Sequence, residues 1–308
     1  AAEKHMSETG GTPSEVAQSP ARGRRSRHEW LERYTRHPGL MTGLVILVVL
    51  LVIAIAAPVL APYEPTKTDL GNTLAHPTWD HLLGTDQFGR DVLSRLIWGS
   101  RISLQVALAV VVISLTLGTL IGAIAGFAGG WIDRVIVVAN DILLAFPGFL
   151  LALAIVAARG SSLESVIAAV SIAFTPRVAA VMRSVVLTIR PRLFIEASRA
   201  IGMSQARILL RHIVPNAMPP VIVVATVSAA TAILAEAGLS FLGLGVQPPT
   251  ATWGNIISDG NATITTNPLI SFSAGLCIAV AVVALNLLGD GLRDTLDPQM
   301  RRQTGRIL

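Results

Sequence analysis

Long stretches without charged residues constrain this chain more than any other feature of its sequence. Residues 102–128 contain no Asp, Glu, Lys or Arg, and five further stretches are largely apolar. An α-helix needs about 20 apolar residues to cross about 30 Å of hydrocarbon. Only 14% of the 308 residues are charged, whereas soluble domains average about 25%. These features exclude an ordinary soluble enzyme and a disordered chain, and they indicate a membrane protein.

The apolar stretches predict an all-α membrane protein with six transmembrane helices. The fourth stretch is the weakest of the six because Arg177 and Arg183 interrupt it. The expected spans are residues 40–61, 102–128, 135–158, 163–187, 216–240 and 270–290. The expected parts of the chain are an N-terminal tail (1–36), in which residues 1–6 resemble an expression remnant, a membrane domain (37–298) and a C-terminal tail (299–308).

The distribution of arginine predicts which side of the membrane each loop occupies. Arginine is concentrated before the first span, in the loop 190–215 and in the C-terminal tail, whereas residues 237–272 contain no Lys or Arg. Basic residues in short loops mark the cytoplasmic side. We therefore expect both termini and the 190–215 loop in the cytoplasm, and the loops 62–101 and 243–269 outside. Because the charges cluster between apolar blocks, the net charge of +5 indicates membrane topology rather than nucleic-acid binding.

The segment from Pro191 to Pro219 predicts two short helices joined by a turn on the cytoplasmic surface. Pro191 can open a helix, Gly202 breaks the run, and Pro215 ends it. Several apolar residues give the segment a partly apolar face: Phe194, Ala197, Ile201, Leu209 and Leu210. Such a face suits a helix that docks in a groove of another protein. It equally suits an amphipathic helix lying on the membrane, and the periodicity does not separate the two.

This segment resembles the EAA signature of ATP-binding-cassette (ABC) importer permeases. The resemblance rests on Glu196-Ala197-Ser198, Gly202 and Ile213-Val214-Pro215, with Ser198, His212 and Val214 departing from the family pattern. Three more segments resemble the same family in the same order. They are the segment Gly84–Asp91 with Asp86 and Arg90, the segment Leu239–Pro249 with Gln247 and the following Trp253-Gly254, and the segment Asn286–Pro298. Together they cover roughly residues 35–300 and are similar to the C-type permease of dipeptide, oligopeptide and nickel importers.

The resemblance implies a type I permease fold and a multi-pass protein of the bacterial cytoplasmic membrane. It implies that Glu196, Ala197, Ser198, Gly202 and Pro215 form a coupling loop that meets a cytoplasmic ATPase. The implied partners are a homologous B-type permease, two ATPase subunits in separate chains or one fused chain, an extracytoplasmic substrate-binding protein and membrane lipid. Short peptides, nickel chelates and haem-like compounds all occur as cargos in this family. The binding protein usually selects among them.

The chain itself contains no sequence for binding ATP. A phosphate-binding P-loop needs G-x-x-x-x-G-K-[ST], and the only lysines, Lys4 and Lys67, follow no such glycine pattern. We expect no enzyme activity, no metal site and no cofactor on this chain, with ATP and Mg²⁺ bound by the partner ATPases. A self-contained transporter or channel would need relay carboxylates deep in the spans, where only Asp141 qualifies. A membrane enzyme or scaffold would need a catalytic cluster, and no such motif is visible.

Two carboxylates lie within or near the expected spans. An ionisable group at membrane depth indicates function by default. Asp141 would act either in gating near the cytoplasmic mouth or in a salt bridge to Arg177 or Arg183. Glu236 would line the passage and attract the amino group of a peptide, or it would be a simple interfacial carboxylate.

Three glycines follow one face of the second span. Gly118, Gly122 and Gly126 recur at every fourth residue, and small residues let membrane helices approach closely. The stripe predicts either packing within the chain or a contact with another subunit.

Overall fold

The computed structural model describes residues 37–296, and every regular element in this range is a helix. The N-terminal tail with residues 1–6, the C-terminal tail and Pro298 lie outside the described residues. Five helices are long and apolar enough to cross a membrane, and a bent pair makes a sixth crossing if it is counted as one span. The prediction of an all-α membrane protein is confirmed.

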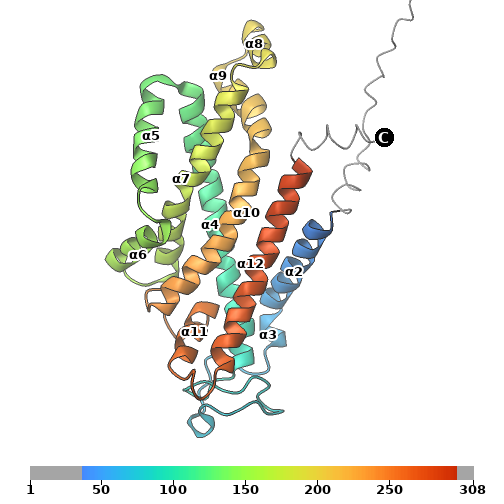
Figure 1. Ribbon diagram of the computed structural model, residues 1–308, viewed down its shortest axis with the longest axis vertical. Coiled ribbons are helices and arrows are strands. Elements are labelled where there is room, and N and C mark those ends of the chain that lie inside the picture. The colour runs from blue at the N-terminus through green and yellow to red at the C-terminus, as the bar shows by residue number, and fades with distance from the viewer. Residues whose placement is uncertain (1–36, 297–308) are drawn as a thin grey trace, which may run out of the picture.

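The longest helices, α4 (Val92–Ala128), α7 (Leu163–Ile189), α10 (Val214–Phe241) and α12 (Leu269–Leu296), run side by side along much of the molecule (Figure 1). Helices α2 (Pro38–Ile55), α5 (Gly130–Leu144) and α6 (Gly148–Arg159) are shorter, and α6 runs across the direction of the others. The short elements are α3 (Ala57–Leu60), the 3₁₀ helix η1 (Leu70–Asn72), α8 (Leu193–Ala200), α9 (Gln205–Ile208), the π-helix η2 (Leu209–Ile213) and α11 (Trp253–Asn261). Because α8 and α11 lie towards opposite ends of the molecule, we call these ends the α8 end and the α11 end.

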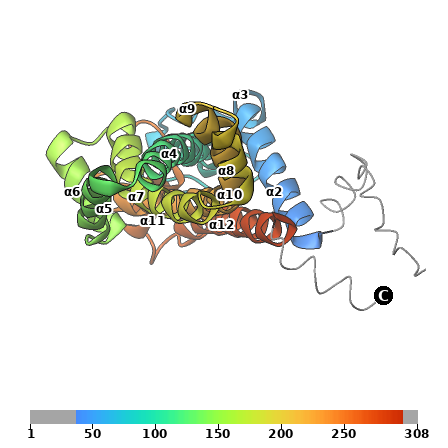
Figure 2. The same ribbon diagram turned by 90° about the horizontal axis from the view of Figure 1, so that it is seen from above.

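Helices α4 and α10 form the centre of the bundle (Figure 2). Helix α4 packs against α7 on one side, and α10 packs against α4, α7 and α12. Helix α2 packs against α12 and α4 at the edge. Its residues are apolar all round and only three of them are buried, as expected for a helix that faces lipid.

The glycine stripe of α4 packs against α7 within the same chain. A Cβ atom on Gly118 would lie 2.6 Å from Cβ of Val178, and one on Gly122 would lie 2.3 Å from the carbonyl oxygen of Ala179. A Cβ atom on Gly126 would lie 2.9 Å from the carbonyl oxygen of Arg183. The stripe is therefore explained by packing within the chain, and the alternative of a subunit contact through these glycines is wrong.

Helix α4 begins ten residues before the expected second span. Asp91 caps its first turn, because its Oδ2 accepts a 2.7 Å hydrogen bond from the Ser94 N–H. An aspartate at this position satisfies backbone donors that would otherwise be unpaired. Residues 92–101, which the sequence assigned to a loop, are therefore helical.

The expected third span is broken into α5 and α6, whose axes differ by 86°. Pro147 lies in the break; it has no N–H and disfavours a helical conformation of the residue before it. The prediction of one continuous helix over 135–158 is wrong for this reason.

The segment between α7 and α10 contains the two short helices expected, but the second does not end at Pro215. The helical run continues from Gln205 to Phe241, and Pro215 is the second residue of α10. A proline cannot donate the usual helical hydrogen bond. The π-helix η2 lies immediately before it, and such a widened turn absorbs the missing bond.

Candidate functional sites at the two ends of the bundle

The α8 end exposes large apolar side chains. Ile195 and Ile208 are fully buried and anchor α8 and α9 on the bundle. Leu193 and Ile201, in contrast, are 81% and 78% exposed. Exposed apolar residues that gather in one place mark an interaction site. We call the exposed residues between 193 and 210 the coupling surface.

A sharp turn at Gly202 shapes the coupling surface. Gly202 has φ of +80°, a conformation that glycine adopts at no steric cost. Its N–H donates to the Arg199 carbonyl at 3.0 Å, and the Met203 N–H donates to the Ser198 carbonyl at 3.1 Å. These two bonds form a Schellman motif that ends α8. The turn predicted from the sequence is confirmed.

The structure brings three of the five expected coupling residues together at the surface. Glu196, Ala197 and Gly202 are exposed on α8 and its turn. Ser198 is buried, and its hydroxyl donates to the Phe194 carbonyl at 2.7 Å. Pro215 lies beyond the coupling surface, on α10. Ser198 therefore lies beneath the coupling surface, whereas Pro215 is exposed outside it.

Four charged side chains form a buried network at the α11 end. Arg90 Nε donates to Asp86 Oδ2 at 2.7 Å, and Arg95 contacts the same oxygen. Arg90 and Arg95 also reach Asp259 at 3.1 and 2.9 Å. Two cations and two anions leave the network neutral, as buried charges require. We call these four residues the ion-pair hub.

The ion-pair hub joins three parts of the chain that are far apart in sequence. Asp86 and Arg90 belong to the loop before α4, Arg95 to α4 itself, and Asp259 to α11. The sequence motif contained Asp86 and Arg90 but not the other two residues. Asp259 is 169 residues from Arg90, so no local pattern could have paired them.

The loop before α4 is built by its own backbone turns. Gly84 has φ of +75°, and a Cβ atom there would lie 2.3 Å from the Ala75 carbonyl oxygen. Earlier in the loop, hydrogen bonds from the Asn72 side chain and the Gly71 N–H hold the pKa of Asp69 below its ordinary value. The loop is therefore a shaped surface rather than a simple linker.

Trp253 and Glu236 connect α11 to the bundle. Trp253 is 1% exposed, and its indole N–H donates to the Leu96 carbonyl at 3.1 Å. The Trp253 backbone N–H and the Glu236 carboxylate both bond to the Ser103 hydroxyl, at 3.3 and 3.2 Å. Glu236 also accepts a 2.8 Å hydrogen bond from Ser240. The bonds tie α4, α10 and α11 together.

Glu236 is fully buried within the described chain. Neither expected position, on the wall of the passage or at the interface with water, matches this placement. Its partners are the hydroxyl groups of Ser240, four residues along α10, and of Ser103 on α4, which is 133 residues away in sequence. The outer-loop residue Gln247 is exposed, and its side-chain amide donates to the carbonyls of Gly243 and Gly245.

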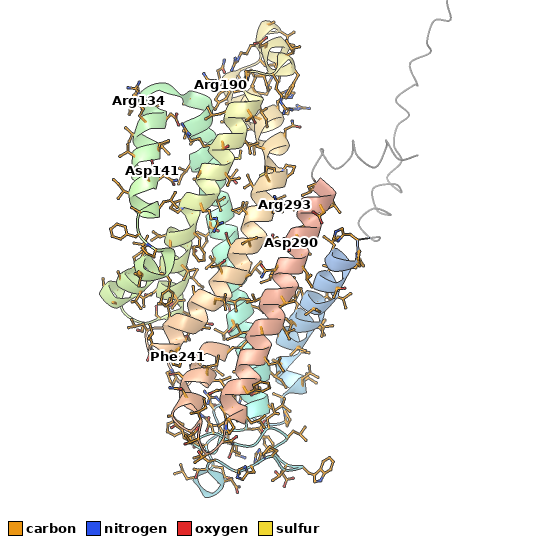
Figure 3. The ribbon with its side chains drawn as sticks, in the orientation of Figure 1. Arg134, Asp141, Arg190, Phe241, Asp290 and Arg293 are labelled. Atoms are coloured by element: carbon orange, nitrogen blue, oxygen red, sulfur yellow. The ribbon has the colours of Figure 1, made fainter. Side chains whose placement is uncertain are left out.

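Asp141 is exposed on α5, where Figure 3 shows it on the same helix as Arg134. Arg183 pairs with Asp133 instead, through bonds of 2.6 and 2.7 Å. Within residues 37–296, Asp141 makes no ion pair. The expected salt bridge to Arg177 or Arg183 is therefore wrong. At Arg183 the reason is that Nε and Nη2 of the guanidinium group already donate to the Asp133 carboxylate.

Comparison with known proteins places the chain beside transport proteins. Residues 118–302 match the model of the family described as binding-protein-dependent transport system inner membrane component. Residues 27–77 match the N-terminal transmembrane domain of oligopeptide transport permease C. The dipeptide transport system permease protein DppC of Alkalihalophilus pseudofirmus is 44% identical over 85% of this chain and 86% of its own length. A peptide transport system permease protein of Brucella abortus is 40% identical over 88% and 91%. The glutathione transport system permease protein GsiD of Escherichia coli O157:H7 is 41% identical over 89% and 91%.

Proposed function

Because the chain belongs to the family of binding-protein-dependent transport system inner membrane components, we propose that it is one of two paired permeases in an ATP-driven importer of short peptides. The observation that carries this proposal is the coupling surface, which presents apolar side chains around the turn at Gly202. The chain has no P-loop lysine. The energy of ATP must therefore reach it through a contact with another protein.

The coupling surface is suited to a cleft in a cytoplasmic ATPase. Leu193 and Ile201 are the most exposed apolar residues on it, and burying such a side chain contributes about 1.5–3 kcal/mol. Glu196, Ala197 and Gly202 would make the contact. Helix α8 lies beyond the ends of the neighbouring long helices (Figure 1). This position favours docking into a protein over lying flat on the membrane.

The two ends of the molecule indicate where the remaining partners would bind. The α8 end, with its arginines, would face the cytoplasm, where two ATPase subunits or one fused chain bind ATP and Mg²⁺. A homologous permease would complete the path across the bacterial plasma membrane. An extracytoplasmic binding protein would dock at the α11 end, on the loops that the ion-pair hub and Trp253 hold in place.

Short peptides are the cargo class that the relatives share. Their names refer to dipeptides, peptides and glutathione, and glutathione is itself a short peptide. Charged residues at membrane depth face water or protein rather than lipid. The exposed, unpaired carboxylate of Asp141 would accordingly line the path, where it can meet the amino group of a peptide.

A matched pair of glycine substitutions tests the coupling role. Gly202 and Gly160 both have positive φ, and neither would place a Cβ atom within 4 Å of a neighbour. Gly202→Trp should therefore strain the backbone as much as Gly160→Trp, but only the former blocks the coupling surface. We expect Gly202→Trp to abolish uptake of a radiolabelled dipeptide by intact cells, with membrane insertion unchanged. Gly160→Trp should retain most of the uptake, and normal uptake by Gly202→Trp would refute the coupling role.

A further inference from the structure

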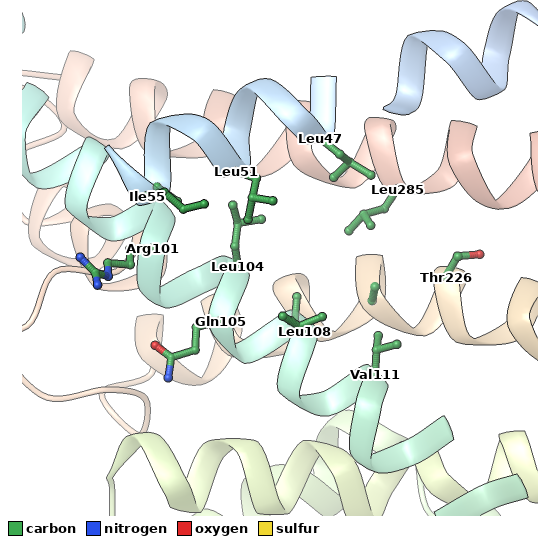
Figure 4. Close-up of a pocket in the computed structure, with 13 residues that line it drawn as sticks. Leu47, Leu51, Ile55, Arg101, Leu104, Gln105, Leu108, Val111, Thr226 and Leu285 are labelled. Atoms are coloured by element: carbon green, nitrogen blue, oxygen red, sulfur yellow. The ribbon is translucent and has the colours of Figure 1, made fainter. Parts of the chain in front are cut away.

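An apolar groove of about 530 Å³ opens between α2 and α4, with α10 and α12 behind it (Figure 4). Five of its thirteen lining residues are leucines: Leu47, Leu51, Leu104, Leu108 and Leu285. Its polar lining residues are Arg101, Gln105 and Thr226. The Thr226 hydroxyl already donates to the Val223 carbonyl at 2.8 Å. The side chains of Arg101 and Gln105 are exposed, and within residues 37–296 they make no hydrogen bond or ion pair, so both are free to bind a ligand.

Arg101 lies where the membrane boundary should be. It is the last charged residue before the charge-free stretch 102–128. Its guanidinium carbon lies 5.8 Å from the centre of the Trp98 ring, and tryptophan is enriched at membrane–water interfaces. Within the described part of the chain, Arg101 has no acidic partner within salt-bridge distance. The groove thus has a positive charge at its interfacial end that is not held in a salt bridge, although Glu64 lines the neighbouring pocket with Arg101.

The groove extends from this boundary over the depth of one leaflet. From Arg101 to Val111, both in its lining, α4 rises about 15 Å. Half of the hydrocarbon core is also about 15 Å. Gln105 lies one helical turn deeper than Arg101, and Figure 4 shows the two side chains near the same end of the groove.

We propose that this groove binds one phospholipid of the leaflet at the α11 end. The lipid phosphate pairs with Arg101, and a glycerol ester carbonyl accepts a hydrogen bond from Gln105. One acyl chain lies along the leucines of α2 and α4. The site involves neither the cargo nor the contact with the ATPases. A failed test of lipid binding would therefore leave the proposed function unaffected.

The walls of the groove favour lipid over a helix of the partner permease. Helices that meet in membranes use small residues at the contact, as α4 does at Gly118, Gly122 and Gly126 against α7. The groove has buried alanines (Ala54, Ala107 and Ala229) in its lining, but the side chains exposed in it include long leucines such as Leu51 and Leu108. Helix α2 also exposes only apolar residues beside the groove, among them Val52 and Ile55 at 55% and 69%.

Photolabelling of the complete transporter tests the proposal. The complex would be placed in nanodiscs that contain phosphatidylglycerol with a photoactivatable acyl chain, and the labelled peptides would be mapped by mass spectrometry. We expect labelling within residues 47–55 and 104–111. Arg101→Gln should reduce this labelling at least fivefold, and so should Leu108→Trp, which fills the groove from a 64% exposed position.

Two matched variants control for general effects on the membrane contact. Arg159→Gln removes an exposed arginine from the end of α6, and Leu120→Trp enlarges a 51% exposed leucine elsewhere on α4. Both should leave the labelling of the groove unchanged. Equal labelling in wild type, Arg101→Gln and Leu108→Trp would overturn the proposal. It would also be overturned if a cysteine at Leu108, in a Cys277→Ala background, crosslinked to the partner permease, because the groove would then hold protein.

Discussion

Asp86 is the residue on which the α11 end depends most. Its carboxylate is 1% exposed and accepts hydrogen bonds from the backbone N–H groups of Phe88 and Arg90 at 2.8 and 3.0 Å. The side chains of Arg90 and Arg95 complete its partners. A buried carboxylate is tolerated only when its charge is compensated in this way. The segment Gly84–Asp91, which resembles the permease family, therefore has a structural role: it connects the loop before α4 to α4 and α11.

Asp86→Asn should strongly destabilise the protein. The substitution leaves two arginines in the ion-pair hub against one carboxylate, and breaking a buried ion pair costs about 3–5 kcal/mol. Thermal unfolding of the purified protein in detergent measures the loss. Asp80→Asn is the matched control, because Asp80 is exposed in the same loop. Equal unfolding midpoints for the two variants would show that the hub does not stabilise the fold.

At the scale of helices, the contact between α4 and α7 predicts opposite effects for the same substitution at two sites. Replacing glycine by alanine inside a helix adds about 0.5–1 kcal/mol of stability where space allows. Gly275 in α12 has no atom within 4 Å of the added methyl position, so Gly275→Ala should raise the unfolding midpoint. Gly122→Ala should lower it, because the methyl group would lie 2.3 Å from a backbone oxygen of α7. A midpoint raised by both variants would contradict the close packing.

Helix α5 packs against α4 and α7, and polar contacts join it to α7. It has no buried residue; the Arg183 guanidinium donates to Asp133, and the Asn140 side-chain amide donates to the Pro176 carbonyl. Asp133→Asn should weaken this attachment by about 1–3 kcal/mol. Hydrogen–deuterium exchange should then become faster in residues 130–144. The charge-swapped double variant Asp133→Arg/Arg183→Asp should restore slow exchange, whereas equally fast exchange would assign the effect to something other than the ion pair.

Features that depend on neighbouring residues, such as helices and turns, could be predicted from the sequence. Contacts between segments distant in sequence could not. The apolar stretches and Gly202 depend on neighbouring residues, and the turn lies where it was expected. The helices cover the expected apolar stretches, although α4 begins earlier and the third stretch is broken into α5 and α6. Pro215 was expected to end a helix and does not, whereas Pro147, which the expected third span included, breaks one. Before Pro215, the π-helix accommodates the helical hydrogen bond that a proline cannot donate. No sequence pattern distinguishes the two outcomes. The burial of Glu236 and the pairing of Arg95 with Asp259 depend on how distant segments fold together.

For the whole molecule, the proposed function predicts a defined set of partners. The chain would be purified in mild detergent from cells that express its neighbouring proteins, and the partners would be identified by mass. We expect one related permease and two ATPase domains, and Gly202→Trp should lose the ATPases but retain the permease. Recovery of the chain alone, moving solute without ATP, would contradict the importer and favour a self-contained transporter.

The continuous helical run from Gln205 to Phe241, which includes the π-helix η2, can transmit movement from one end of the molecule to the other. Its 37 residues extend over about 55 Å, so a tilt of about 5° at one end displaces the other by about 5 Å, nearly one helical turn. One end starts within the coupling surface, and the other is fastened to α11 through Glu236, Ser103 and Trp253. Under the proposed function, a small rotation of the coupling surface by an ATPase would thus become a large displacement of the α11 end, where the binding protein would deliver the cargo.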